Sequence, residues 1–375
     1  MFDYEVLRLI WWALLGVLLA GFAIMDGFDL GVAMLYRFLG KDDAERRVLL
    51  ETIEPVWDGN QVWFILGGGA VFAAWPILYA TSFSGFYLAM LLVLLALILR
   101  PVSFVFRNKL TDSTWRNVWD WGLFVSGVVP SLVFGVAFGN VLKGVPFHFD
   151  DTLRMTYEGN LFGLLNPFAL LCGLVSVAML AMHGATYAAL KTEDVINRRA
   201  AVTARLAALA YLALFTLTGM WLASGIDGYR ITSVVDPNAP SNPLNKEVML
   251  AAGAWLDNYQ RYPWMLAAPI AAYAGAVLAW LMVKSKPGLA FIGSALSAAA
   301  TICTAGFSVF PFLLPSSADP RSSLTVWDAS SSQGTLLNMF IAALIFVPIV
   351  LAYTSWVYAV LRGKVSLKDL HDGVY

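Results

Sequence analysis

Residues 8–36 read RLIWWALLGVLLAGFAIMDGFDLGVAMLY, an apolar run that is long enough to cross a membrane and yet contains two aspartates. A spanning helix needs about 20 mostly apolar residues at a rise of 1.5 Å per residue. The preceding MFDYEVL lacks the basic start of a signal peptide, and the run itself is too long for one. We therefore expect this first helix to stay in the membrane.

The composition extends this prediction to the whole chain. Of 375 residues, 59% are hydrophobic and 13% are charged, whereas an ordinary soluble domain carries about 25% charged residues. We expect an all-α polytopic membrane protein that forms a single integral membrane domain over residues 1–375. Nine runs of spanning length lie near 8–36, 57–78, 80–104, 117–142, 161–190, 203–225, 264–283, 289–312 and 334–361. Gly67 to Gly69 and Pro76 interrupt the second run, so eight spans are the alternative.

Lysine and arginine predict the orientation, because short cytoplasmic loops carry the excess of basic residues. With nine spans, most of the 24 basic residues fall on one side, which places the N-terminus outside and the C-terminus in the cytoplasm. The longest outside segment, 226–263, mixes turn formers with aromatics and is predicted to be an ordered extracytoplasmic cap. The net charge of -1 gives no basis for nucleic-acid binding. The predicted cytoplasmic residues are Arg37, Lys41, Arg46, Arg47, Arg100, Arg107, Lys109, Arg116, Lys191, Arg198, Arg199, Arg205, Lys284, Lys286, Arg362, Lys364 and Lys368.

Acids inside the membrane are the first functional candidates, because a charged residue at mid-bilayer costs about 2.5 to 3.5 kcal/mol on insertion scales. Asp26 and Asp29 stand three residues apart and share a helix face. Counting back from Arg37 places them about 16 and 12 Å from the cytoplasmic end of the helix. Proton or ion handling is one interpretation, and carboxylates held by neighbouring helices are the other. Arg100 lies at a depth where it can pair with an acid or snorkel to the headgroups.

The sequence VWDGNQVW at 56–63 gathers polar residues between two tryptophans at the cytoplasmic start of the second span. Asp58 suits proton uptake, and it equally suits capping of the helix N-terminus. The flanking Trp57 and Trp63 belong to the same candidate site. The pairs Gly27/Gly31 and Gly135/Gly139 have the GxxxG spacing that lets membrane helices approach closely.

Haem and metal ligands are scarce. Haem iron is bound by axial His, Met or Cys, but His148 is in an outside loop, His371 is in the tail, and only His183 belongs to a helix. Cys172 and Cys303 form no CxxC or CxxCH motif. We expect no metal site and no cofactor bound by this chain alone.

The segments MFDYEVLRLIWW, AGFAIMDGFDLGV, EPVWDGNQVWF, FAAWP, SGFYLAM, SNPLNKEV and FPFLLPSS closely resemble subunit II of the cytochrome bd quinol oxidases. The resemblance covers essentially the whole chain. It implies two four-helix bundles plus one peripheral helix in a bacterial cytoplasmic membrane. It also implies a partner, subunit I, that binds quinol together with haem b558, haem b595 and haem d. The family reaction oxidises quinol and reduces oxygen to water; some members also have small single-helix accessory subunits or a structural quinone in subunit II.

For site residues, the resemblance implies a cytoplasmic proton route through Asp58 with Asp26 deeper in the membrane. Trp63 matches the position of a proposed oxygen route, and Trp57 and Trp63 are candidate oxygen or quinone contacts. This chain departs from some relatives by having Val105 where they carry an acid. Two other functions remain open from the residues alone: a proton-coupled secondary transporter and a purely structural membrane scaffold.

Overall fold

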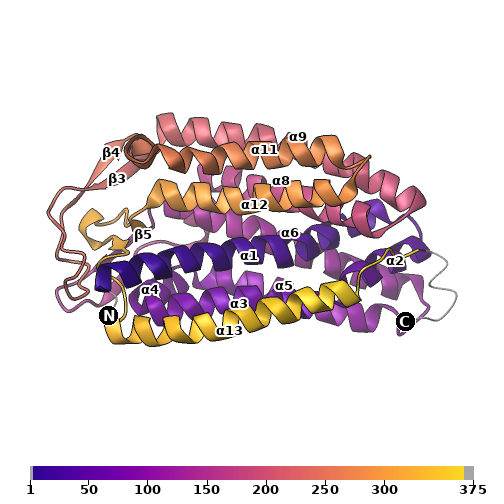
Figure 1. Ribbon diagram of the computed structural model, residues 1–375, viewed down its shortest axis with the longest axis horizontal. Helices are drawn as coiled ribbons and strands as arrows, with labels where there is room; N and C mark the ends of the chain where they lie inside the picture. Colours follow the sequence, from indigo (N-terminus) through magenta and orange to yellow (C-terminus); the bar gives the residue numbers. More distant parts are fainter. Residues whose placement is uncertain (1–2, 367–375) are drawn as a thin grey trace.

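The computed structural model describes residues 3–366, so Lys368 and His371 lie outside the described part of the chain. Long helices run side by side along the longest axis (Figure 1). Within residues 3–366, eight helical segments are long and apolar enough to cross a membrane. They are α1 (Tyr4–Leu39), α5 (Tyr87–Arg107), α6 (Ser113–Lys143), α8 (Pro167–Lys191), α9 (Asp194–Gly225), the segment Pro263–Met282 with η2 (Pro263–Leu266) and α11 (Ala267–Met282), α12 (Pro287–Val309) and α13 (Gln333–Val360).

The second predicted span is divided into α3 (Trp57–Ala74) and α4 (Pro76–Gly85). The break falls at Trp75, whose ψ of 73° is not helical, because Pro76 disfavours helical geometry in the residue before it. Figure 1 shows α3 beside α1 and α13, with α1 starting at one end of the molecule and α13 finishing at the other. This arrangement suits an odd number of crossings, but α3 is not among the eight apolar spans of the described residues. The count of nine stays a prediction.

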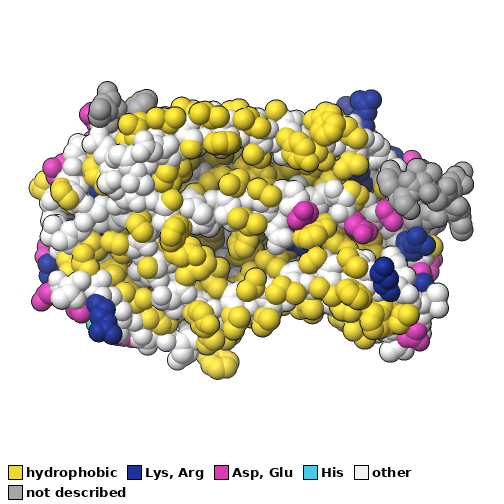
Figure 2. Space-filling view, turned by 90° about the horizontal axis from the view of Figure 1, so that it is seen from below, with side chains coloured by type: hydrophobic (Ala, Val, Ile, Leu, Met, Phe, Trp, Pro, Cys, Tyr) yellow, Lys and Arg dark blue, Asp and Glu magenta, His cyan; other side chains and the backbone are white. Residues whose placement is uncertain are grey.

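The long helices form two groups and one peripheral helix. In one group α1 packs on α3 and α6, and α6 packs on α5. In the other α8 packs on α9 and α12, and α11 packs on both of these. α1 and α6 join the groups by packing on α8. α13 lies at the edge; Leu336 is its only buried residue over Gln333–Val360. Figure 2 shows hydrophobic side chains across the middle of one face and charged side chains mainly toward the two ends, as a membrane environment requires.

Several boundaries differ from the sequence prediction. α5 begins at Tyr87 instead of at 80, because α4 continues to Gly85. α2 (Asp43–Ile53) is an additional short helix, capped by the Asp42 carboxylate accepting from the Glu45 amide. The predicted helix 161–190 is divided into α7 (Leu161–Leu164) and α8, because Asn166 caps α8 and Pro167 starts it. α9 begins at Asp194 instead of near 203. Its first turns are polar, so a search for apolar runs does not include them.

Short antiparallel hairpins cover the end of the molecule where α1 begins (Figure 1). They pair β1 (Phe147–Phe149) with β2 (Met155–Tyr157), β3 (Asp227–Ile231) with β4 (Val248–Ala252), and β5 (Phe312–Leu314) with β6 (Leu324–Thr325). The segment 226–263 thus holds β3, β4, η1 (Ala254–Leu256) and α10 (Asp257–Arg261). A further 3-10 turn, η3 (Pro320–Ser322), precedes β6.

Buried Arg8 attaches the segment 226–263 to α1. Its Nη2 donates to the Ala239 carbonyl at 3.1 Å, and its Nε donates to Ser330 Oγ at 2.8 Å. Lys246 Nζ lies 2.8 Å from the Asp328 carboxylate in a largely buried ion pair. Burial lowers the pKa of Lys246, and Asp328 opposes that shift.

The glycine pairs make the close helix contacts that their spacing predicts. A Cβ on Gly31 would lie 2.1 Å from the Leu180 carbonyl oxygen, and one on Gly139 would lie 2.6 Å from the Ala169 Cα. Both contacts are with the backbone of α8, so neither can be relieved by a side-chain rotation. α8 is therefore held between α1 and α6 at backbone distance.

We predict that Gly31→Ala destabilises the protein, because the added methyl group overlaps the α8 backbone and overpacking costs about 1–3 kcal/mol. Gly16→Ala is the matched control on the same helix, where an added Cβ meets nothing within 4 Å. Thermal unfolding of the detergent-solubilised protein should show a lower midpoint for Gly31→Ala only. Equal midpoints for the two variants would contradict the close contact.

Candidate functional site

Asp26 and Arg100 form an ion pair inside the helix bundle. Arg100 Nη1 lies 2.7 Å from Asp26 Oδ1, and Nη2 lies 3.3 Å from Oδ2. Arg100 is 0% exposed and Asp26 is 1% exposed. The alternative in which Arg100 snorkels to the headgroups is therefore wrong. Two nearly parallel N–H···O bonds give the arginine–carboxylate geometry that fixes both orientation and charge. α1 and α5 are thereby joined by a charge pair.

Asp29 is fully buried three residues further along α1 and has different partners. Asn60 Nδ2 on α3 donates to Asp29 Oδ2 at 2.8 Å. The Tyr358 hydroxyl on α13 donates to Asn60 Oδ1 at 2.7 Å. Asp29 Oδ1 is buried without a hydrogen-bond partner in the described residues, as is Arg100 Nε. One carboxyl oxygen of Asp29 therefore accepts a hydrogen bond, and the other accepts none from the described residues.

Asp58 is exposed, in the first turn of α3. The helix N-cap is Val56, and no side chain caps the helix, so the capping interpretation of Asp58 is wrong. Its carboxylate makes no hydrogen bond or ion pair with the described residues. Two positions later the chain is buried at Asn60. The start of α3 therefore passes from an exposed acid to the amide that contacts Asp29.

The two candidate tryptophans occupy different surroundings. Trp57 is next to the ion pair, with the Arg100 guanidinium carbon 5.6 Å from its ring centroid. Trp63 packs on α1, where its ring closes over Gly21. The adjacent Phe64 lines an apolar cavity of about 660 Å³ between the two helix groups. Only Trp57 therefore contacts the charged site, whereas Trp63 contacts Gly21 on α1.

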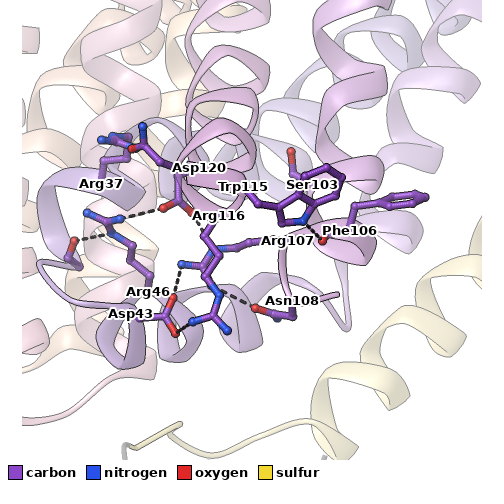
Figure 3. A network of polar contacts seen from close by, with 12 residues as sticks. Arg37, Asp43, Arg46, Ser103, Phe106, Arg107, Asn108, Trp115, Arg116 and Asp120 are labelled. Atoms are coloured by element: carbon purple, nitrogen blue, oxygen red, sulfur yellow. Dashed lines mark hydrogen bonds and ion pairs between the residues drawn. The ribbon is translucent and has the colours of Figure 1, made fainter. Parts of the chain in front are cut away.

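A second charged cluster, which sequence analysis missed, joins α2 to the α5–α6 hairpin (Figure 3). Fully buried Asp120 accepts from Arg107 Nε at 2.6 Å and from Arg46 Nη1 at 2.8 Å. Asp43 accepts from Arg107 Nη2 at 2.8 Å and from Arg116 Nη1 at 2.7 Å. These contacts hold the helix that leads into α3 and thus fix the start of the candidate site. Asp120 sits within a helical run whose neighbouring tryptophans resemble an interfacial belt, so its burial had no distinct sequence signal.

The surroundings of His183 do not suit a haem ligand. Its Nδ1 is 2.8 Å from Ser294 Oγ, and its Nε2 is 2.8 Å from the Ile24 carbonyl oxygen. The ring is also stacked on Phe291 with centroids 4.8 Å apart. Both ring nitrogens are used in helix packing, whereas an axial ligand needs one nitrogen free for iron. Residues 3–366 contain no group of three or more His, Cys, Asp or Glu placed to hold a metal ion.

Comparisons with known proteins agree on one family. The family model for cytochrome bd terminal oxidase subunit II matches residues 7–361. Cytochrome bd-I ubiquinol oxidase subunit 2 of Escherichia coli K12 is 53% identical over 100% of this chain and 99% of its own length. Cytochrome bd ubiquinol oxidase subunit 2 of Bacillus subtilis is 33% identical over 96% and 97%. The structure of bd oxidase from Geobacillus thermodenitrificans shares the fold, with a TM-score of 0.69 at 15% identity, over 95% of this chain and 99% of that one.

We predict that removing either partner of the Asp26–Arg100 pair destabilises the protein by about 3–5 kcal/mol, because the remaining charge is left buried and unpaired. The double variant Asp26→Asn/Arg100→Gln should lose less than the sum of the two single variants. Unfolding free energies in detergent give the coupling. The control is the exposed pair Arg230–Asp257, for which the expected coupling is about 0–1 kcal/mol. Additive losses at Asp26 and Arg100 would contradict an energetically coupled pair.

Proposed function

Because this chain belongs to the cytochrome bd terminal oxidase subunit II family, we propose that it supplies a proton-uptake route for oxygen reduction in subunit I. The family makes the chain a subunit of a quinol-oxidising oxidoreductase complex, and it does not support the transporter or the scaffold as the main function. The observation that carries the proton route is the buried group of Asp26, Asp29 and Arg100, which has two carboxylates and one guanidinium.

The charges of this buried group favour a protonated Asp29 carboxyl. Arg100 neutralises Asp26 through the paired contacts, so an ionised Asp29 would leave a net negative charge in a low-dielectric interior. Such a charge costs several kcal/mol unless it is paired. Asp29 is neutral when it holds a proton and becomes charged when it releases one. It can therefore act as a proton-holding site inside the bundle, which is the usual role of intramembrane acids in proton relays.

Asp58 supplies the connection to solvent in this proposal. It is exposed at the start of α3, and α3 also provides Asn60, the hydrogen-bond partner of Asp29. An amide does not carry a proton onward by itself, so water has to bridge Asp58 and the buried carboxylates. Asp58 would collect protons, Asp29 would hold them, and Asp26 with Arg100 would set the local field. Trp57 beside Arg100 would limit water access to the pair.

Haem in the complex belongs to subunit I in this proposal, as haem b558, haem b595 and haem d. Bound there, haem supplies the reduction of oxygen, while the residues of this chain hold and move protons. The engaged ring of His183 supports that division. A structural quinone would suit the 660 Å³ cavity, whose walls include Phe22, Phe134 and Phe215 and whose lining also has Gln260 and Ser308.

Subunit I packs, we propose, against the face that carries α3 and α13. A Cβ on Gly67, Gly68 or Gly69 of α3 would meet nothing within 4 Å, which leaves room for a close helix from a partner. α13 exposes Ile345, Phe346 and other large apolar side chains beside it. The face in Figure 2 is hydrophobic across its middle. Lipids and small single-helix accessory subunits would cover the remaining apolar surface.

The chain is a multi-pass protein of the bacterial inner membrane, as its relatives and apolar helices show. We propose that the end with the hairpins faces outside, so that α2 and Asp58 face the cytoplasm. This orientation follows from the basic residues around α2, including Arg46 and Arg116. Protons for oxygen reduction would then come from the cytoplasm.

We predict that a cysteine replacing Lys41 is protected from impermeant thiol reagents added outside, whereas one replacing Val234 is labelled. Val234 is 99% exposed in the loop between β3 and β4, and Lys41 is exposed near α2 at the opposite end. The background should lack Cys172 and Cys303. Permeabilised cells are the control, because both sites should then react. Labelling of the Lys41→Cys variant in intact cells would reverse the proposed orientation.

We predict that Asp58→Asn and Asp58→Ala both assemble with full haem content but oxidise quinol slowly, because each lacks the titratable carboxyl and neither removes a helix cap. The measurement is quinol-driven oxygen consumption and membrane potential in proteoliposomes between about pH 6 and 8, a range centred near neutrality. Asp151→Asn, an exposed acid between β1 and β2, is the control. Turnover of Asp58→Asn at the unmodified rate across this range would reject the proton role of Asp58.

A further inference from the structure

Three side chains connect the peripheral helix to the buried carboxylates. Tyr358 on α13 donates to Asn60 on α3 at 2.7 Å, and Asn60 donates to Asp29 on α1 at 2.8 Å. Asn60 is 1% exposed and Asp29 is 0% exposed, so water does not compete from the surface for the bond between Asn60 and Asp29. This series of hydrogen bonds ends at Asp29 Oδ2, while Asp29 Oδ1 has no hydrogen-bond partner in residues 3–366.

The phenol determines which end of the amide faces the carboxyl. An asparagine side chain has one acceptor oxygen and one donor nitrogen. While Tyr358 donates to Asn60 Oδ1, the Nδ2 group points at Asp29. A reversed amide would present its carbonyl oxygen to Asp29 and would leave the phenol hydrogen without this acceptor. Tyr358 is half-buried and its bond to Asn60 is partly shielded from solvent, so loss of this acceptor carries a free-energy cost. Tyr358 therefore holds the amide in the donating orientation.

We propose that Tyr358 and Asn60 are positioning residues for Asp29, and that Asp29 binds and releases its proton at Oδ1. Oδ2 already accepts an N–H group, so a hydrogen placed there would face the Asn60 amide hydrogens. Oδ1 is the oxygen left open. This inference rests on the proposed function, in which Asp29 holds a proton, and it adds which atom carries that proton and which residues decide it.

Both charged side chains and phenols surround Asp29. Its titratable or charged neighbours are Asp26 on α1, Arg100 on α5, Tyr187 on α8 and Tyr358 on α13. Arg100 is bound to Asp26, and the Tyr187 hydroxyl donates to the Thr52 carbonyl. α3 contributes the neutral amide of Asn60. Removing the Tyr358 hydroxyl therefore changes the hydrogen bonding of Asp29 without changing any formal charge near it.

A purely structural role for Tyr358 makes a different prediction. The inner end of α13 is also held by Lys191, whose Nζ donates to the Leu361 carbonyl at 2.7 Å. If Tyr358 only anchored α13, then Tyr358→Phe would change stability and leave the Asp29 carboxyl group as it is. A vibrational signal from Asp29 separates the two roles, because the stretching frequency of a carboxylic C=O rises when it loses a hydrogen-bond donor.

The experiment is infrared difference spectroscopy of the complete oxidase complex, in which the Asp29 band is the carboxylic C=O band lost in Asp29→Asn. We expect Tyr358→Phe and Asn60→Leu each to shift this band to higher frequency, because Oδ2, the C=O oxygen of the protonated acid, loses the N–H donor. Tyr353→Phe is the matched control, since Tyr353 is 63% exposed on the same helix and should leave the band unchanged.

The outcomes separate this inference from the proposed function. An unshifted band in Tyr358→Phe, or no carboxylic band lost in Asp29→Asn, overturns the positioning inference. A shifted band together with unmodified quinol turnover in Asp29→Asn supports the inference and rejects the proton route. A shifted band together with slow turnover in Asp29→Asn supports both.

Discussion

The rest of the site depends on one constraint, which is that the buried guanidinium of Arg100 must meet a carboxylate. An unpaired arginine at the centre of a membrane helix costs about 2.5 to 3.5 kcal/mol on insertion scales, and Asp26 removes that cost through two contacts. The pair sets the rotation of α1 against α5. With α1 fixed in this way, Asp29, one helical turn further along, is directed at α3. The position of the second carboxylate is therefore a consequence of how the first one is neutralised.

The parts of this arrangement that sequence predicted are those with an unusual residue in an apolar context. Asp26, Asp29 and Arg100 are conspicuous because charges are rare inside spanning helices, and their burial follows from that position. Gly31 and Gly139 are conspicuous by spacing, and each contacts the α8 backbone. The grouping into two helix bundles and a peripheral helix came from the family resemblance, and the contacts among the long helices agree with it.

The parts of the site that the sequence did not predict involve residue types that are common at their positions in a helix. Asn60 follows an acid near a helix start, and Tyr358 lies near a helix end, where tyrosines commonly face the headgroups. Only their meeting across α3 and α13 gives them a role, and that meeting depends on contacts between distant segments. The same limit applies to Asp120, whose two arginines come from α2 and α5. The hairpins were missed because strands of two to five residues carry too little periodicity to detect.

The weakest span and the candidate site coincide, and the coincidence has a physical reason. α3 is too polar to be counted among the apolar spans, because its first turns hold Asp58, Asn60 and Gln61. A helix selected only to lie in lipid would not keep these residues, since each raises the free energy of transferring the helix into the bilayer. Yet Asn60 is the residue that reaches Asp29, and Asp58 is the exposed acid before it. Local rules of membrane-helix composition fail where a sequence serves another requirement. Here the failure falls on Asn60, which donates to the buried Asp29, and on the exposed Asp58 two positions before it.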